Sequence, residues 1–129
     1  RIHVPEELRQ IIIPRFLLQP IVENSFEHGF TGMAPEEKRQ IIITARKMGD
    51  RMILRVRDNG RGMSLKQVKK INQKFSQPYD AIALRHQKEH GIGLDNINDR
   101  LQIFSHSNDR LVLRSREGKY TSMFILQTL

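Results

Sequence analysis

The order in which helix-like and strand-like segments follow one another constrains the fold more than any other feature of this sequence. Apolar residues recur with helical spacing in three segments, 15–28, 64–75 and 94–104. Strand-like patterns occupy four others, 39–48, 51–57, 110–116 and 120–127. Strands and helices do not alternate as they do in a doubly wound parallel sheet. We therefore predict an α+β two-layer sandwich, in which helices cover one face of a mixed, mostly antiparallel sheet.

Short turns and a proline mark the boundaries of these segments. Glycines at 49 and 118 stand between consecutive strands and favour hairpins. Pro20 lies inside the first helical segment, so this helix is predicted either to kink there or to restart with Pro20 as its first residue. Gly29 is a natural end for it. Residues 1–4 are β-like, and the polar residues 76–90 lack a period and are predicted to form a loop.

Length and composition restrict the classes of protein to which the chain can belong. Its 129 residues, 38% of them hydrophobic, suffice for one core, so we predict a single domain over residues 1–129. The absence of cysteine excludes disulfides, thiolate metal sites and a cysteine nucleophile. No apolar run is long enough to span a bilayer, and no signal peptide opens the chain. Because the first residue is Arg1, we expect the chain to be a piece of a longer protein.

The first polar cluster, residues 23–29, lies at the end of the first helical segment. Asn24 and His28 are one turn apart and share the helix stripe that otherwise carries Leu17 and Ile21. A carboxamide and an imidazole on an apolar stripe need polar partners if they are buried. The cluster therefore indicates either a binding site or a stripe that emerges into solvent at the helix end.

The second cluster, residues 58–63, directly follows a strand-like segment. Gly60 and Gly62 permit a close backbone approach or a positive φ. Asp58, at the end of the strand, can accept hydrogen bonds from an amine. A tight turn explains the same residues equally well.

The third cluster, residues 91–96, opens the last helical segment. Glycines in front of the free N–H groups of a helix start form an anion site suited to phosphates. A dinucleotide fingerprint would require a glycine or alanine where Asn96 stands, with a strand before it, so that interpretation fails. The chain also lacks the glycine-rich sequence of a P-loop.

Taken together and in this order, the clusters read E-N-x-x-x-H-G, D-N-G-x-G-M and G-I-G-L-x-N-x-x-x-R-L. This series resembles the N, G1 and G2 boxes of the GHKL superfamily, whose ATP-binding domain has the Bergerat fold. Residues 18–24 and 91–101 are most similar to LytS/YesM-like bacterial sensor histidine kinases. The resemblance places the N box at about 19–29, the G1 box at 58–63, the ATP lid at about 64–90 and the G2 box at 91–101.

The resemblance implies roles for individual residues. Asp58 is expected to hold the adenine amine, and Asn24 is expected to hold the Mg²⁺ ion that bridges the phosphates. His28 faces the same pocket, and Glu23 has a supporting catalytic role. The remaining nucleotide-binding residues are expected to come from the boxes, the lid and the last strand: Asn59, Gly60, Gly62, Met63, Arg85, Lys88, Gly91, Ile92, Gly93, Leu94 and Thr121.

The resemblance also implies a reaction and partners. The domain would bind Mg²⁺ and ATP and donate the γ-phosphoryl group to a histidine on a separate dimerisation domain of the same parent, since none of the five histidines here lies in a matching context. The resemblance further implies a cognate response regulator, a homodimeric parent and a cytoplasmic position in a membrane-bound sensor. It implies neither nucleic-acid binding nor membrane insertion by this domain. The sequence departs from relatives at Glu27, where they often carry lysine, and at Tyr120, where many carry glycine.

Several alternatives remain open. A GHKL ATPase, a serine kinase or a nucleotide-binding module without histidine transfer would share the same boxes. The net charge of +8, from 22 basic and 14 acidic side chains, also suits a nucleic-acid-binding module, although no aromatic platform accompanies it. Residues 86–90 read H-x-x-E-H, a zinc signature, but without an apolar helix face or an evident third ligand.

Overall fold

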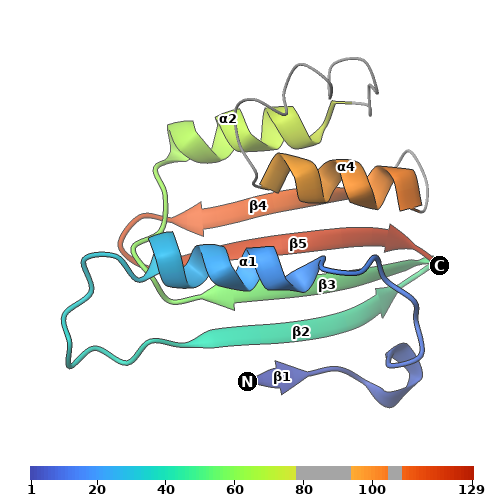
Figure 1. Cartoon of the computed structure of the whole chain (residues 1–129), viewed down its shortest axis with the longest axis horizontal. Coiled ribbons are helices and arrows are strands. Elements are labelled where there is room, and N and C mark those ends of the chain that lie inside the picture. Colours follow the sequence, from blue (N-terminus) through green and yellow to red (C-terminus); the bar gives the residue numbers. More distant parts are fainter. Residues whose placement is uncertain (78–93, 105–108) are drawn as a thin grey trace.

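A computed structural model describes residues 1–77, 94–104 and 109–129 of the chain. Five strands form one sheet in the order β1-β2-β3-β5-β4 (Figure 1). The shortest, β1 (Ile2–His3), pairs in parallel with β2 (Ile41–Met48), and all other pairs are antiparallel. The central strand is β3 (Arg51–Asp58), and the last two form a hairpin, β4 (Arg110–Arg116) and β5 (Tyr120–Thr128). The predicted mixed, mostly antiparallel sheet is confirmed.

The helices lie on one side of this sheet. They are α1 (Leu18–Asn24), α2 (Leu65–Phe75) and α4 (Leu94–Phe104), with a short 3₁₀ turn, η1 (Glu6–Leu8), before them. A π-helical turn, η2 (Ser25–Gly29), continues α1 directly. In Figure 1, α1 lies in front of the central strands, and α2 and α4 run along the edge strand β4, which both contact. The predicted two-layer sandwich is therefore confirmed.

The core lies between the two layers and follows the alternation of the strands. Met52, Leu54 and Val56 of β3 point toward the helices and are 2–5% exposed. The helices meet them with apolar side chains such as Ile21 of α1 and Phe75 of α2, which are also buried. This packing fixes which face of each strand meets the helix layer. It therefore also fixes the direction of the polar side chains at the strand ends.

The first helix begins later than its apolar pattern predicts and contains its proline in the first turn. It starts at Leu18, after Phe16 with a positive φ of 58°, so the predicted start at residue 15 is wrong. Pro20 is its third residue, where a missing N–H costs nothing because the first four N–H groups of a helix have no partner within it. The helix already begins two residues before Pro20, so the predicted restart with Pro20 as its first residue is wrong.

The second helix begins as its sequence predicts. Ser64 is its N-cap: the Ser64 hydroxyl accepts a hydrogen bond from the Gln67 N–H, while the Gln67 side chain accepts one from the Ser64 N–H. This reciprocal capping box satisfies two donors that the first turn leaves free. It fixes the point at which the chain leaves the 58–63 loop and enters α2.

Two asparagines join the helix layer to the exposed edge of β4. The Asn72 side chain donates to the Leu113 carbonyl (2.8 Å) and accepts from the Leu113 N–H (2.7 Å). Asn98 of α4 accepts from the Leu111 N–H at 2.8 Å and donates to the Phe75 carbonyl. These side chains occupy backbone groups that an edge strand otherwise offers to another chain, and they hold α2 in place beside the sheet.

Candidate functional site

A cavity of about 1000 Å³ opens between the helix layer and the ends of the central strands. Its walls come from the α1–η2 helix, the end of β3 with the 58–63 loop, α2, the start of α4 and the β4–β5 hairpin. Polar residues of the lining include Asn24, Ser25, His28, Asp58, Gln67, Lys70, Lys74 and Thr121. The N-box and G1-box clusters, separated by the first hairpin in sequence, thus share one site.

Asp58 is the buried anion of this cavity. It is the last residue of β3, and the inward parity of that strand leaves it 5% exposed. Its carboxylate accepts hydrogen bonds from the Ser25 hydroxyl (2.8 Å) and from the Gly60 N–H (3.0 Å). Two donors fix the orientation of the carboxylate, and each oxygen retains a lone pair for a further donor. The site therefore offers a fixed acceptor for an N–H group such as an exocyclic amine.

Gly29, at the end of η2, keeps the space beside this carboxylate open. A Cβ at Gly29 would lie 3.2 Å from all three atoms of the Asp58 carboxyl group. That distance is shorter than ordinary van der Waals contact, so any side chain here would press on the acceptor. The glycine that ends the first helical segment therefore has a role in the site as well as in the helix end.

The glycines of the 58–63 loop bring backbone against backbone. A Cβ at Gly60 would lie 2.0 Å from the Gly29 carbonyl oxygen, and Arg61 N–H donates to that same oxygen at 2.7 Å. Gly62 has a φ of +67°, and its Cβ would lie 2.1 Å from the Arg116 carbonyl oxygen. The positive φ that the spacing suggested occurs at Gly62. Both glycines serve contact between chain segments, which places Asp58 against η2.

The N-box residues do not all face the cavity. Asn24 and His28 both line it, although the π-helical turn intervenes between them. No hydrogen bond to the Asn24 side chain occurs among the described residues. Glu23 is exposed, lies outside the lining and accepts a hydrogen bond from Gln19 (2.9 Å). The structure therefore brings the carboxamide and the imidazole to the site, and not the carboxylate.

Of the other described G1-box residues, some line the cavity and some do not. The Asn59 side chain turns away from the cavity, because it accepts from the Gln40 N–H (2.8 Å) and donates to the Lys38 carbonyl (2.7 Å). Gly60 is also outside the lining, whereas Gly62 and Met63 are part of it. Asn59 thus anchors the loop to the segment before β2.

The last strand contributes one side chain that the sequence singled out. Thr121 stands opposite Asp58 in the β3–β5 register and lines the cavity. Its hydroxyl is 3.1 Å from the Ser115 hydroxyl, which in turn accepts from the Met63 N–H at 2.8 Å. The hairpin and the 58–63 loop are joined at the wall of the site.

Part of the expected site lies outside the described residues. This is so for Arg85, Lys88, Gly91, Ile92, Gly93 and the H-x-x-E-H segment 86–90. Leu94, the first residue of α4, does line the cavity. Within the described ranges, no group of three or more histidine, aspartate or glutamate side chains is arranged to hold a metal ion.

Sequence reasoning missed several residues of the lining. Ser25 holds the Asp58 carboxylate, and it carries no signal beyond its position between Asn24 and His28. Lys70 and Lys74 also line the cavity, whereas Arg85 and Lys88 are the basic residues that the resemblance assigns to nucleotide binding. Gln67, Lys70 and Lys74 follow each other at spacings of three and four residues, so the helical period alone would have placed them on one stripe.

Comparison with known proteins identifies the family of the chain. Residues 10–129 match the family of histidine kinase-, DNA gyrase B- and HSP90-like ATPases, and the chain belongs to this family. Within it, the chain is similar to sensor histidine kinases of the LytS kind. Sensor protein LytS of Oceanobacillus iheyensis is 30% identical over 125 residues, covering 97% of this chain and 20% of the relative. Sensor histidine kinase BtsS of Escherichia coli is 34% identical over 89 residues, covering 60% of this chain and 15% of the relative.

Solved structures show the same fold at low sequence identity. The blue-light-activated histidine kinase of Erythrobacter litoralis superposes with a TM-score of 0.61 at 14% identity, covering 99% of this chain and 34% of that one. The catalytic domain of histidine kinase ThkA gives 0.53 at 18% identity, covering 87% and 63%. The chain spans a fifth or less of the curated relatives named above. No described helix is long and apolar enough to cross a membrane.

Proposed function

We propose that this chain is the ATP-binding catalytic domain of a two-component sensor histidine kinase, and that it binds ATP with Mg²⁺ in the cavity between its layers. The single observation that carries the proposal is the buried Asp58 carboxylate, fixed by two donors beside the open space at Gly29. In the proposal this carboxylate accepts a hydrogen bond from the adenine amine. A fixed, buried acceptor discriminates strongly against a base that lacks the matching donor.

The rest of the lining fits a polyphosphate. Lys70 and Lys74 of α2 and Arg61 of the 58–63 loop bring positive charge to the walls. Cationic side chains offer charge-assisted hydrogen bonds to phosphate oxygens. The proposal assigns these residues to phosphate binding, together with the expected contributions of Arg85, Lys88 and the G2-box residues 91–94.

Asn24 is the residue proposed to hold Mg²⁺. Its carboxamide faces the cavity and has no hydrogen-bond partner among the described residues. A carboxamide oxygen is a hard ligand of the kind that Mg²⁺ accepts alongside phosphates and water. A single protein ligand is consistent with the absence of an acidic metal cluster in the described part of the chain, because Mg²⁺ is often held mainly by substrate phosphates and water.

ATP would supply the γ-phosphoryl group, and the acceptor in this proposal is a histidine on a dimerisation domain of the same parent. The domain's own residues would orient the nucleotide, neutralise its charge and exclude water. A response regulator, a homodimeric parent and a cytoplasmic position in a membrane-bound sensor complete the proposal. Glu23 remains a proposed catalytic support that acts from outside the described lining.

The proposal is tested by following labelled γ-phosphate from ATP in a mixture of this domain and the histidine-bearing region of its parent. We expect transfer that gives an acid-labile, base-stable phosphoryl linkage on the acceptor. Acid-stable label would indicate a serine kinase, release as free phosphate alone would indicate an ATPase, and binding without transfer would indicate a nucleotide-binding module. Each of these three results contradicts histidine transfer.

Asn24→Ala is expected to reduce the dependence of ATP binding on Mg²⁺. Loss of one ligand oxygen removes a contact of about 1–1.5 kcal/mol, so the affinity for ATP in Mg²⁺ should fall about fivefold to tenfold. Isothermal titration calorimetry with Mg²⁺ and with EDTA measures the change. Gln19→Ala removes an exposed carboxamide from the same helix, outside the lining, and should change neither affinity. An unchanged Mg²⁺ dependence in Asn24→Ala would remove this residue from the metal site.

A further inference from the structure

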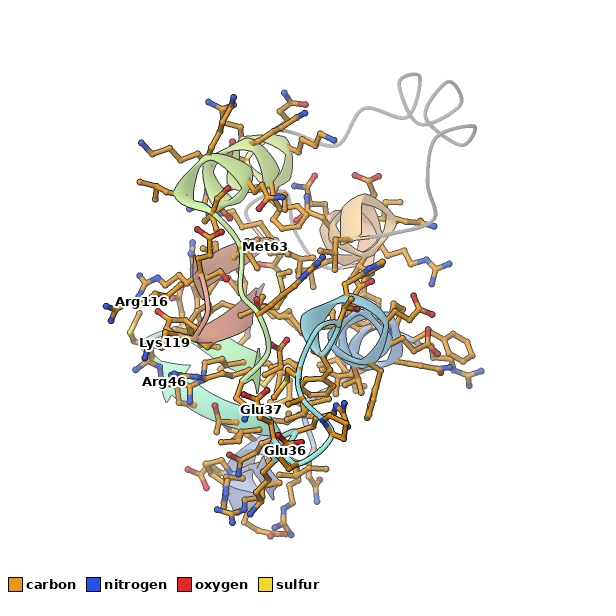
Figure 2. The ribbon with its side chains drawn as sticks, turned by 90° about the vertical axis from the view of Figure 1, so that its left-hand side faces the viewer. Glu36, Glu37, Arg46, Met63, Arg116 and Lys119 are labelled. Carbon is orange, nitrogen blue, oxygen red and sulfur yellow. The ribbon has the colours of Figure 1, made fainter. Side chains whose placement is uncertain are left out.

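The face of the sheet opposite the helices is dominated by arginine. Along β2–β5, the residues that point to this face alternate with the residues that enter the core. On neighbouring strands the outward residues are paired in register, as Arg55 is with Phe124 and Arg114 is with Ser122. Figure 2 shows Arg46 and Arg116 on the side of the sheet away from α1 and α4. We call this surface the arginine face, and its cations are Arg46, Arg51, Arg55, Arg57, Arg110, Arg114 and Arg116.

No ion pair between these arginines and a carboxylate occurs among the described residues. The outward positions of β2–β5 carry no aspartate or glutamate, and the ion pairs found among the described residues, Arg9 with Glu6 and His28 with Glu27, lie elsewhere. At the centre of the face, the Nε atom of Arg55 is buried without a hydrogen-bond partner. Like charges on neighbouring strands repel one another. Because the outward positions of these strands carry no carboxylate, this repulsion between the arginines is not offset there.

Apolar and aromatic side chains lie between the arginines. Ile53 is only 6% exposed on this face, and Val112, Phe124 and Leu126 are half-buried around it. Arg57 stacks over the Tyr120 ring at 4.1 Å, and the Arg114 guanidinium lies 5.4 Å from the Phe124 ring centre. Arginine with aromatic and aliphatic neighbours is the composition enriched at protein–protein interfaces.

The same contacts argue against two other occupants. Single-stranded nucleic acid binds a sheet by stacking its bases on free aromatic rings, but here guanidinium groups lie over both rings. A second copy of this chain would place one arginine face against another and oppose like charges. A protein surface that bears carboxylates suits both the positive charge of the face and its guanidinium groups, because guanidinium binds carboxylate through two parallel hydrogen bonds.

We propose that the arginine face is a docking surface for an acidic surface of a partner protein, with apolar side chains between its carboxylates. The inference does not depend on the proposed ATP binding. The cavity lies on the helix side of the sheet and the arginine face on the other, so partner and nucleotide can be bound together.

The test titrates the chain with a soluble glutamate-rich peptide that carries interspersed valines. We expect saturable binding, with backbone amide shifts in NMR spectra confined to β2–β5. The double variant Arg46→Gln/Arg114→Gln should weaken binding about tenfold, since it removes two exposed guanidinium groups of the face. Arg15→Gln/Arg100→Gln removes the same charge from the turn before α1 and from α4, outside the arginine face, and should leave the affinity unchanged. Both variants should keep the wild-type melting temperature.

Three results would overturn the proposal. Equal losses of peptide affinity in the two double variants would mean that net charge alone attracts the peptide. Amide shifts centred on the cavity would place the peptide at the other site. Stronger binding of single-stranded DNA or of phosphatidylglycerol vesicles, with the same sensitivity to Arg46→Gln/Arg114→Gln, would assign the face to nucleic acid or to a membrane surface.

Discussion

Asp58→Asn is expected to weaken ATP binding about 10-fold to 100-fold while leaving the fold intact. The asparagine keeps the shape of the side chain and an oxygen that can accept from the Gly60 N–H, and the Ser25 hydroxyl can accept from its amide. The change replaces an acceptor by a donor where the adenine amine is proposed to bind. A hydrogen bond to a charged group contributes about 1.5–3 kcal/mol, which gives this range of affinity.

Calorimetric titration with ATP and with GTP measures both affinity and base preference. Guanine presents a carbonyl where adenine presents an amine, so Asp58→Asn should also lower the ratio of ATP to GTP affinity. Asp50→Asn makes the same chemical change at an exposed turn between β2 and β3 and should alter neither quantity. If Asp58→Asn bound ATP as tightly as the unaltered chain, Asp58 would not be the adenine acceptor.

The two hairpins of the sheet could be predicted because each of their strands carries its own signal. Alternation along residues 51–57 gave β3 and its buried face, and a glycine at each hairpin fixed its pairing with the neighbouring strand. The pairing of β1 with β2 and of β3 with β5 joins residues far apart in sequence, which no local pattern specifies. The start of α1 was missed because apolar spacing continues before Leu18, where the positive φ of Phe16 prevents a helix.

The sequence predicts that a side chain faces the cavity only where the period of a helix or strand directs that side chain inward. Asp58 lies on the inward face of a strand and Asn24 on the inner stripe of a helix, so both residues line the cavity. Asn59 follows the strand end and is free to turn either way, and its bonds to the segment before β2 decide its direction. The partner of Gly60, the carbonyl of Gly29, is a tertiary contact that glycine content alone cannot identify.

Gly62→Ala is expected to destabilise the domain more than any other Gly→Ala change at a positive φ. At +67°, an alanine is strained by about 1–2 kcal/mol. Its Cβ would also lie 2.1 Å from the Arg116 carbonyl oxygen and 2.7 Å from the carbonyl carbon. These are backbone atoms of β4 that cannot rotate away, so overpacking adds about 1–3 kcal/mol. At about 4 °C per kcal/mol for a domain of this size, the melting temperature should fall by about 8–20 °C.

Gly49→Ala separates the two causes of this loss. Its φ of +62° imposes the same strain, but nothing lies within 4 Å of the added Cβ, so the melting temperature should fall by only about 4–8 °C. The alanine at position 62 can be accommodated only if the 58–63 loop moves away from the hairpin, which breaks the bond from the Gly118 N–H to the Arg61 carbonyl (2.6 Å) and shifts the cavity wall. Gly62→Ala should therefore also weaken ATP binding below its melting temperature, and Gly49→Ala should not. Equal decreases in melting temperature, with unchanged ATP affinity in both variants, would show that the contact between Gly62 and Arg116 does not hold the loop in place.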